Sequence, residues 1–285
     1  MKVGGNMLDI SITNQQKQYL LYFLESETLV TLPKVAAHFQ CSKVNSKKII
    51  DRMVHIGLVY KENNKIYLTD LGHRLAVEHQ HEQQDMALVL HEGLGIEKES
   101  AEELASTMLI EESRGMRKQL LSMARYFSQV ADRQGDSISA EEIIEILGVG
   151  KFKTYFVVFR DETGPERDAF MPLSMALEGF YKDALICIDE NGENSIEMRT
   201  KAVDKNQDGK AYRGKAKLII FYSNGERETR PIGQVCRLPF EVIKEWYYVG
   251  GGILQASLDL CIVPDSPVTH QQFAQFVFTI NLFNL

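Results

Sequence analysis

Apolar side chains recur at helical spacing in three short stretches near the N-terminus. The first is Gln15–Glu25. The second begins at Leu32-Pro33, because proline fits the first helical turn, where its missing N–H costs nothing. The third runs over Ser42–Ile56, with a serine suited to cap its start and Gly57 suited to end it. We expect the buried side of this third helix to consist of Val44, Ile49 or Ile50, Met53 and Ile56.

A strand, turn and strand follow this helix. Leu58–Lys61 and Ile66–Thr69 have the composition of short strands, and the polar residues Glu62–Lys65 lie between them. Three helices followed by such a hairpin predict a winged helix-turn-helix over residues 1–75.

The remaining pattern divides into a helical and a β-rich part. Residues 76–131 have helical patterning with a break near Gly93-Leu94-Gly95, and residues 132–150 resemble a linker. Ser139 and Glu142 have capping-box spacing, which predicts a short helix over Ala140–Leu147 in this linker. Residues 151–285 contain short β-like runs, so the predicted fold class is α+β. The strand candidates are Thr154–Arg160, Ala184–Ile188, Ser195–Ala202, Lys217–Tyr222, Ile253–Val263 and Phe276–Phe283.

Turn signals punctuate the β-rich part. Asn191-Gly192 and Asn224-Gly225 each supply the positive φ angles of a tight type I′ hairpin turn. Pro239–Trp246 is compatible with a helical turn. Gly250–Gly252 would permit a bulge, a flexible turn or close approach of a ligand.

Composition and charge narrow the classes of protein. The chain is 44% hydrophobic and 25% charged, which is ordinary for a globular protein. It contains no apolar run of signal-peptide or membrane-span length, which predicts a cytoplasmic location without membrane contact. The four cysteines are scattered, which predicts reduced thiols. The net charge is −7, yet cations cluster locally between Lys43 and Arg52, while Glu92–Glu112 is strongly acidic.

The polar side of the third helix is the strongest functional signal. Small polar and cationic side chains near a helix N-terminus suit the major groove of double-stranded DNA, and a hairpin beside it suits the phosphate backbone. The expected DNA contacts are Ser42, Lys43, Asn45, Ser46, Lys47, Lys48, Arg52, Asn63, Asn64 and Lys65.

These stretches resemble the diphtheria toxin repressor family of metal-dependent regulators. The resemblance rests on an R-M-x-x-x-G-L-V step at Arg52–Val59 and an L-T-x-x-G step at Leu68–Gly72, and it covers residues 13–128. It implies a homodimer that binds a pseudo-palindromic operator, and we expect a transcriptional repressor, with an activator as the open alternative. Residues 76–131 would then be the helical dimerisation domain.

The resemblance also implies a metal site, which this chain does not keep intact. Family ligand positions fall on Gln15, Gln18, Gln83 and Glu111-Glu112. A rearranged site is still conceivable, because several donors share one face of a long helix, and His and Glu suit Mn, Fe, Zn or Ni. The candidate ligands are His79, Glu82, Gln83, Met108, Glu111 and Glu112. The alternative is that His79 and His81 are exposed polar residues without a ligand role.

The role of residues 151–285 stays open at this level. We expect them to sense an effector, either a small molecule or a metal ion, or to mediate assembly. No catalytic dyad or phosphate-binding motif is evident, so we do not expect an enzyme. The alternative is a winged-helix protein-interaction module attached to a ligand-binding or enzymatic β domain.

Overall fold

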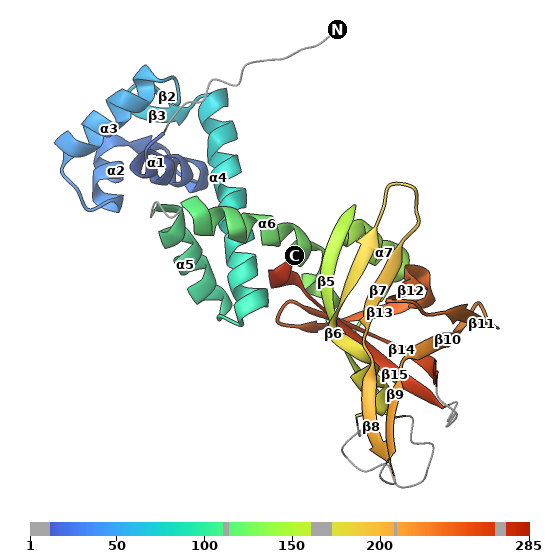
Figure 1. Ribbon diagram of the computed structural model, residues 1–285. Coiled ribbons are helices and arrows are strands. Elements are labelled where there is room, and N and C mark those ends of the chain that lie inside the picture. The colour runs from blue at the N-terminus through green and yellow to red at the C-terminus, as the bar shows by residue number, and fades with distance from the viewer. Residues whose placement is uncertain (1–11, 111–113, 161–172, 208–209, 266–271) are drawn as a thin grey trace. The chain divides into compact units, whose positions relative to one another are not determined.

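The computed structural model describes residues 12–110, 114–160, 173–207, 210–265 and 272–285. The chain divides into two compact units, Met1–Ala124 (unit 1) and Arg125–Leu285 (unit 2), and Figure 1 colours it from blue to red along its length. Described helices predominate in unit 1 and described strands in unit 2, so the predicted α+β class is confirmed. Within the described residues, none of the helices has the length and apolar character needed to cross a membrane.

The first part of unit 1 contains three helices and a small antiparallel sheet. The helices are α1 (Asn14–Glu25), α2 (Leu32–His38) and α3 (Lys43–His55). The sheet has the order β1-β3-β2, with β1 at Val30–Thr31, β2 at Val59–Glu62 and β3 at Lys65–Leu68. The buried side chains between these elements form one core: Tyr19, Leu20, Phe23, Val30, Val35, Ile49, Ile50, Met53, Leu58, Val59, Ile66 and Ala76.

Local sequence explains where these elements begin and turn. Thr13 and Gln16 form a capping box at the start of α1. The Ser42 hydroxyl accepts a hydrogen bond of 3.2 Å from the backbone N–H of Asn45 and thereby caps α3. Asn63 and Asn64, with φ of 48° and 61°, form the tight turn between β2 and β3, since asparagine tolerates the left-handed region.

The second part of unit 1 is helical. It comprises α4 (Asp70–Leu88), a π-helical turn at Val89–Gly93, α5 (Lys98–Ile110) and α6 (Arg114–Val130), which continues past the unit boundary. The predicted break is present at Gly95, whose φ is +68°. Apolar side chains of α4 and α5 form a separate core: Met86, Ala87, Leu90, Ala101 and Ala105, with Ile96, Met108, Leu120 and Leu121 packed against it.

One junction joins the β2–β3 hairpin to α4, and it explains the L-T-x-x-G step. The Thr69 hydroxyl accepts a hydrogen bond from the Gly72 N–H (3.0 Å) and donates one to the Gly57 carbonyl (2.6 Å). A Cβ atom on Gly72 would lie 1.9 Å from the carbonyl oxygen of Leu58. Glycine is therefore required at this position because the two backbones approach so closely.

Gly72→Ala tests this close approach. We expect the free energy of unfolding to fall by about 2 kcal/mol or more, because a backbone carbonyl must move away from the new methyl group. Gly115→Ala, also within a helix, is the matched control, since a Cβ there meets open space; it should not lower the free energy of unfolding, because alanine favours the helix more than glycine does. Urea unfolding measures both, and equal effects in the two variants would contradict the explanation.

Unit 2 is built around a curled, ten-stranded sheet (Figure 1). Its main path has the order β11-β10-β14-β15-β5-β6-β7-β12, and β13 pairs with both β14 and β4. A separate hairpin consists of β8 (Val203–Gln207) and β9 (Lys210–Gly214). The sheet strands are β4 (Ser137–Ser139), β5 (Gly150–Arg160), β6 (Phe180–Ile188), β7 (Ser195–Thr200), β10 (Ala216–Ser223), β11 (Glu226–Pro231), β12 (Val235–Pro239), β13 (Glu245–Gly250), β14 (Ile253–Pro264) and β15 (Phe273–Asn281).

The turn predictions had mixed outcomes. Asn224 and Gly225, with φ of 51° and 84°, form the expected two-residue turn between the paired residues Ser223 and Glu226. The tight turn predicted at Asn191-Gly192 is wrong. There only Gly192 has positive φ, and the loop spans the six residues between β6 and β7. Hydrogen bonds from the Asn191 and Glu193 N–H groups to the Asp189 carboxylate hold this wider loop.

The helical turn expected in Pro239–Trp246 is present as a short 3-10 turn at Phe240–Val242, and β13 begins in the same stretch, at Glu245. One other prediction in unit 2 needs correction. Residues 132–150 are not a free linker. Their strand β4 pairs with β13, and Ile138, Ile143 and Leu147 are buried in unit 2. The short helix predicted there is present as α7 (Ala140–Leu147).

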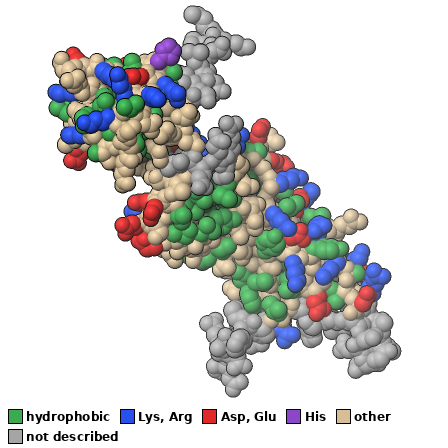
Figure 2. All heavy atoms as spheres, turned by 90° about the vertical axis from the view of Figure 1, so that its left-hand side faces the viewer, with side chains coloured by type: hydrophobic (Ala, Val, Ile, Leu, Met, Phe, Trp, Pro, Cys, Tyr) green, Lys and Arg blue, Asp and Glu red, His purple; other side chains and the backbone are tan. Residues whose placement is uncertain are grey.

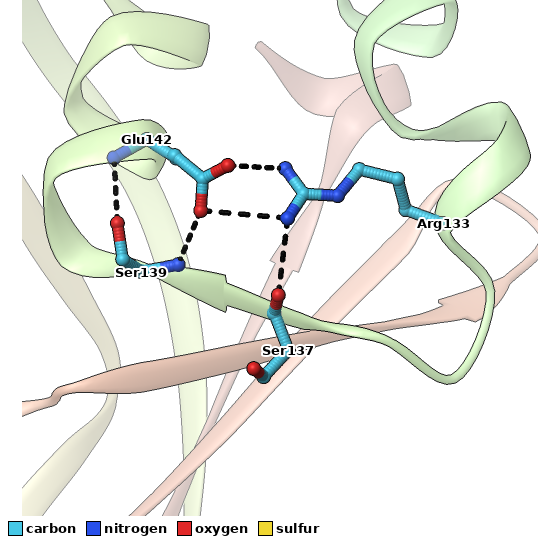
Figure 3. A network of polar contacts seen from close by, with 4 residues as sticks. All are labelled: Arg133, Ser137, Ser139 and Glu142. Carbon is cyan, nitrogen blue, oxygen red and sulfur yellow. Dashed lines mark hydrogen bonds and ion pairs between the residues drawn. The ribbon is translucent and has the colours of Figure 1, made fainter.

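A polar network fixes the start of α7 (Figure 3). The Glu142 carboxylate accepts hydrogen bonds from the Ser139 N–H (2.8 Å) and from Arg133 Nη1 (2.6 Å). The Ser139 hydroxyl accepts one from the Glu142 N–H (3.2 Å), and Arg133 Nη2 donates to the Ser137 carbonyl (3.0 Å). These bonds, that from Arg133 foremost, lower the pKa of Glu142 to about 2.

The lowered pKa of Glu142 predicts a pH dependence. Because the folded pKa lies below the ordinary 4.5, the carboxylate's contribution to stability is fully present above pH 4.5 and is lost as the pH falls toward 2. Glu142→Gln should therefore be less stable than the parent at neutral pH, and the gap should narrow between about pH 4.5 and 2. Chemical unfolding at several pH values measures this gap. Glu141→Gln, one residue earlier in the same turn, is the control; a gap for Glu142→Gln that is constant with pH would contradict the assignment.

Candidate nucleic-acid interface

One side of α3 is solvent-exposed and rich in cations and amides. Five side chains of this helix define it, and we call them the basic face: Lys43, Asn45, Lys47, Lys48 and Arg52. Ser42, the N-cap, is also exposed at its edge. Figure 2 shows lysine and arginine side chains spread over the end of unit 1 that contains α1, α2 and α3. The opposite side of α3 is buried against α1 and α2, so the basic face is free to meet a partner.

Two expectations about α3 were wrong, and both concern the phase of the helix. Ser46 is fully buried, whereas Val44 is 65% exposed. Ser46, Ile49, Ile50 and Met53 recur at helical spacing and share the buried side. Val44 lies two positions from Ser46, about 200° around the helix, and so it lies among the basic-face residues. Residue type was misleading here, since a valine is exposed and a serine is buried.

Ser46 is buried because it belongs to a small polar cluster at the helix-turn-helix turn. The Tyr19 hydroxyl donates to Ser46 Oγ at 3.3 Å, and Cys41 Sγ lies 3.0 Å from the same oxygen. Burial is the largest influence on the pKa of Tyr19, which is raised, so this hydroxyl remains a donor. Gln40, with φ of 45°, and a hydrogen bond from the Cys41 N–H to the Ala36 carbonyl (3.0 Å) complete the turn.

The β2–β3 hairpin lies beside α3 and is tied to it by an ion pair. Lys61 of β2 donates to the carboxylate of Asp51, the acidic residue that interrupts the basic face. The hydrogen bond from Lys61 is the main reason that the pKa of Asp51 is lowered. Asn63 and Asn64 are exposed at the hairpin tip, and Lys65 is half-buried. Lys61 was not selected from the sequence, where it appears only as a strand residue; its spacing from Asp51 becomes meaningful once the hairpin folds back.

The candidate metal ligands do not assemble into a site among the described residues. His79 Nδ1 lies 3.1 Å from Glu82 Oε2, but the same oxygen forms an ion pair with Arg117 of α6. Met108 packs against the apolar core of α4 and α5. Gln83 is half-buried on α4. Glu111 and Glu112 lie outside the described residues.

Within the part of the chain that the structure describes, no group of three or more His, Cys, Asp and Glu side chains could hold a metal ion. The alternative interpretation expected both His79 and His81 to be exposed. His81 is exposed, but His79 is only 7% exposed.

The cysteines offer no reactive site in unit 2. All four are free thiols, as expected, and Cys236 and Cys261 are buried. Burial raises the pKa of Cys236 to about 12 and also raises the pKa of Cys187 and of Cys261. A thiol that stays protonated at neutral pH is a poor nucleophile and a poor metal ligand.

Ser46→Ala tests whether this residue is structural. We expect the free energy of unfolding to fall by about 1–2 kcal/mol, because the buried Tyr19 hydroxyl loses its acceptor. Adding Tyr19→Phe should cost little further, since both polar partners are then gone. The exposed Asn45→Ala is the control and should leave urea unfolding nearly unchanged. Additive losses for Ser46→Ala and Tyr19→Phe would show that the two residues are not coupled.

No family model and no curated protein matches the chain. Among solved structures, it is similar to ScaR with bound Zn²⁺ (15% identity, 76% of this chain and 99% of that one, TM-score 0.35). It is also similar to IdeR of T. acidophilum (16%, 71% and 92%, 0.33) and to a manganese-dependent transcriptional repressor in complex with manganese (16%, 70% and 93%, 0.33).

Three neighbours are described as a manganese regulator, a manganese-dependent transcriptional repressor and a manganese-activated repressor. At this identity and these TM-scores, the function of the present chain has to be argued from its own residues.

Proposed function

We propose that this chain is a DNA-binding transcriptional regulator whose residues 1–75 act as a winged helix-turn-helix. The observation that carries the proposal is the exposure of the basic face, with the opposite side of α3 buried. An α-helix fits the major groove, and the groove demands polar and cationic side chains on the inserted side. The β2–β3 hairpin would be the wing.

Each exposed group has a chemical role in such a complex. The Asn45 amide can donate to and accept from an adenine edge, and Lys47 or Lys48 can reach guanine or a phosphate. Lys43 and Arg52, toward the two ends of α3, are suited to phosphates. Ser42 and the hairpin residues Asn63, Asn64 and Lys65 are suited to the neighbouring sugar-phosphate backbone.

Val44 adds an apolar contact that the sequence pattern had assigned to the core. Its side chain is 65% exposed among the cationic residues of α3. An exposed valine beside the base edges can contact the methyl group of thymine, which distinguishes thymine in the major groove. We therefore include Val44 among the residues that would set sequence preference, and we leave out the buried Ser46.

The finer parts of the proposal rest on the sequence resemblance. The protein would act as a homodimeric repressor, because two copies of α3 one helical turn of DNA apart would read a pseudo-palindromic operator. Residues 76–131 would form the dimer contact. Unit 2 would sense an effector or mediate assembly.

The double variant Lys47→Ala/Lys48→Ala tests the interface. Affinity for all duplexes should fall, and the slope of log affinity against log salt should become less steep by about 2, because two phosphate neutralisations are lost. Fluorescence anisotropy on duplexes selected from a random pool measures both. The control is Lys98→Ala, an exposed lysine on α5 outside the basic face, which should leave the slope unchanged.

The outcomes separate the two classes of function. Asn45→Ala should relax sequence preference more than it weakens nonspecific binding, as expected for a base contact. If the parent protein binds no duplex even at low salt, the winged helix is a protein-interaction module instead.

A further inference from the structure

A partly buried polar cluster joins α4 to α6 in the helical part of unit 1. Arg117 of α6 forms an ion pair with Glu82 Oε2 of α4, and His79 Nδ1 contacts the same oxygen at 3.1 Å. The side chains of Arg117 and Glu82 are 24% and 22% exposed, and that of His79 is 9% exposed. These are therefore not surface charges, and their pairing has consequences for how the helices assemble.

Electrostatics make the carboxylate at this position firmly anionic. Burial by itself would raise the pKa of Glu82, but the hydrogen bond with His79 and the charge of Arg117 outweigh burial, and the pKa is lowered. A charged carboxylate that is largely shielded from water is stabilised by a cation beside it. In this chain the cation is the guanidinium of Arg117.

A divalent metal ion does not fit the same place. Glu82 Oε2 is already engaged by a guanidinium, and a second cation at that oxygen would be repelled by the first. Among the described His, Cys, Asp and Glu side chains, no group of three or more includes His79 and Glu82 in an arrangement that could hold a metal ion, whereas protein sites for transition metals use three or four ligands.

We infer that Arg117 is a built-in cation, which takes at Glu82 the place that a divalent metal would need and holds α4 and α6 together without one. The assembly of the helices follows from the contacts alone. The consequence for DNA binding rests on the proposed function: affinity for DNA is set without a divalent metal ion, and any effector that regulates it acts elsewhere.

The test uses the full chain and begins with the parent protein. We expect its thermal midpoint, followed by circular dichroism, to be the same with chelator, with Mn²⁺ and with Zn²⁺, and calorimetric titration with either ion to detect no stoichiometric site. Its affinity for a selected duplex should change less than twofold between chelator and metal. A stoichiometric site that raises the midpoint, or a tenfold or larger gain in DNA affinity with either ion, overturns the inference.

A double-mutant cycle tests the pairing itself. Arg117→Met keeps an unbranched apolar stem and removes the charge, and Glu82→Gln removes the partner charge. Each should lower the thermal midpoint by a few degrees, and the double variant should lose no more than the worse single variant. Fully additive losses overturn the inference. Lys118→Ala, the exposed neighbouring cation on α6, is the matched control and should leave the midpoint unchanged.

Arg117→Lys is the conservative variant and should retain most of the midpoint, because an ammonium still supplies the charge; loss equal to that of Arg117→Met overturns the inference. The experiments distinguish failure of the proposed DNA binding from failure of the inference about Arg117. If no variant binds duplex DNA, the proposed function falls, while the thermal and metal-titration results still decide whether Arg117 supplies the cation.

Discussion

The burial of one stripe of α3 is the constraint on which the candidate interface depends. Ile50 and Met53 are completely buried, and Tyr19 of α1 lies over Ser46 at the other end of the stripe. A helix with one face held in a core has no freedom to rotate about its axis. The basic face therefore owes its exposure to the packing of the apolar and serine positions behind it, and DNA recognition would use a surface that the core has already oriented.

The same logic extends from α3 to the hairpin and to α4. Lys61 ties β2 to Asp51 of α3, while Thr69 and the close backbone approach at Gly72 join the end of the hairpin to the start of α4. The exposed ion pair contributes little to stability. The glycine contact restricts geometry much more strongly, because backbone atoms cannot yield as long side chains do. This junction gives a physical meaning to the L-T-x-x-G step.

The helical part of unit 1 shows how one residue can change the chemistry of a site. His79 and Glu82 are good metal ligands by type, and they share a face of α4 as their spacing requires. Arg117 comes from a different helix and satisfies the carboxylate directly. In our proposal the Arg117 guanidinium and a divalent ion would compete for the same Glu82 oxygen, and the guanidinium occupies it.

Much of this protein follows from its sequence alone. The bounds of α3, the turn at Asn63-Asn64, the capping box of α7 and the α+β class depend on interactions between residues a few positions apart, which a single sequence displays. The short strands β4, β12 and β13 were not predicted, since pairing partners far away in the chain create them.

Tertiary structure alone decided the rest. Whether Val44 or Ser46 faces water depends on Tyr19, which is 27 residues from Ser46, and whether Glu82 is open to a metal depends on Arg117, which is 35 residues away. Periodicity states which residues share a face but not which face is covered. That choice is made by long-range contacts, because burial and charge pairing depend on neighbours in space and not in sequence.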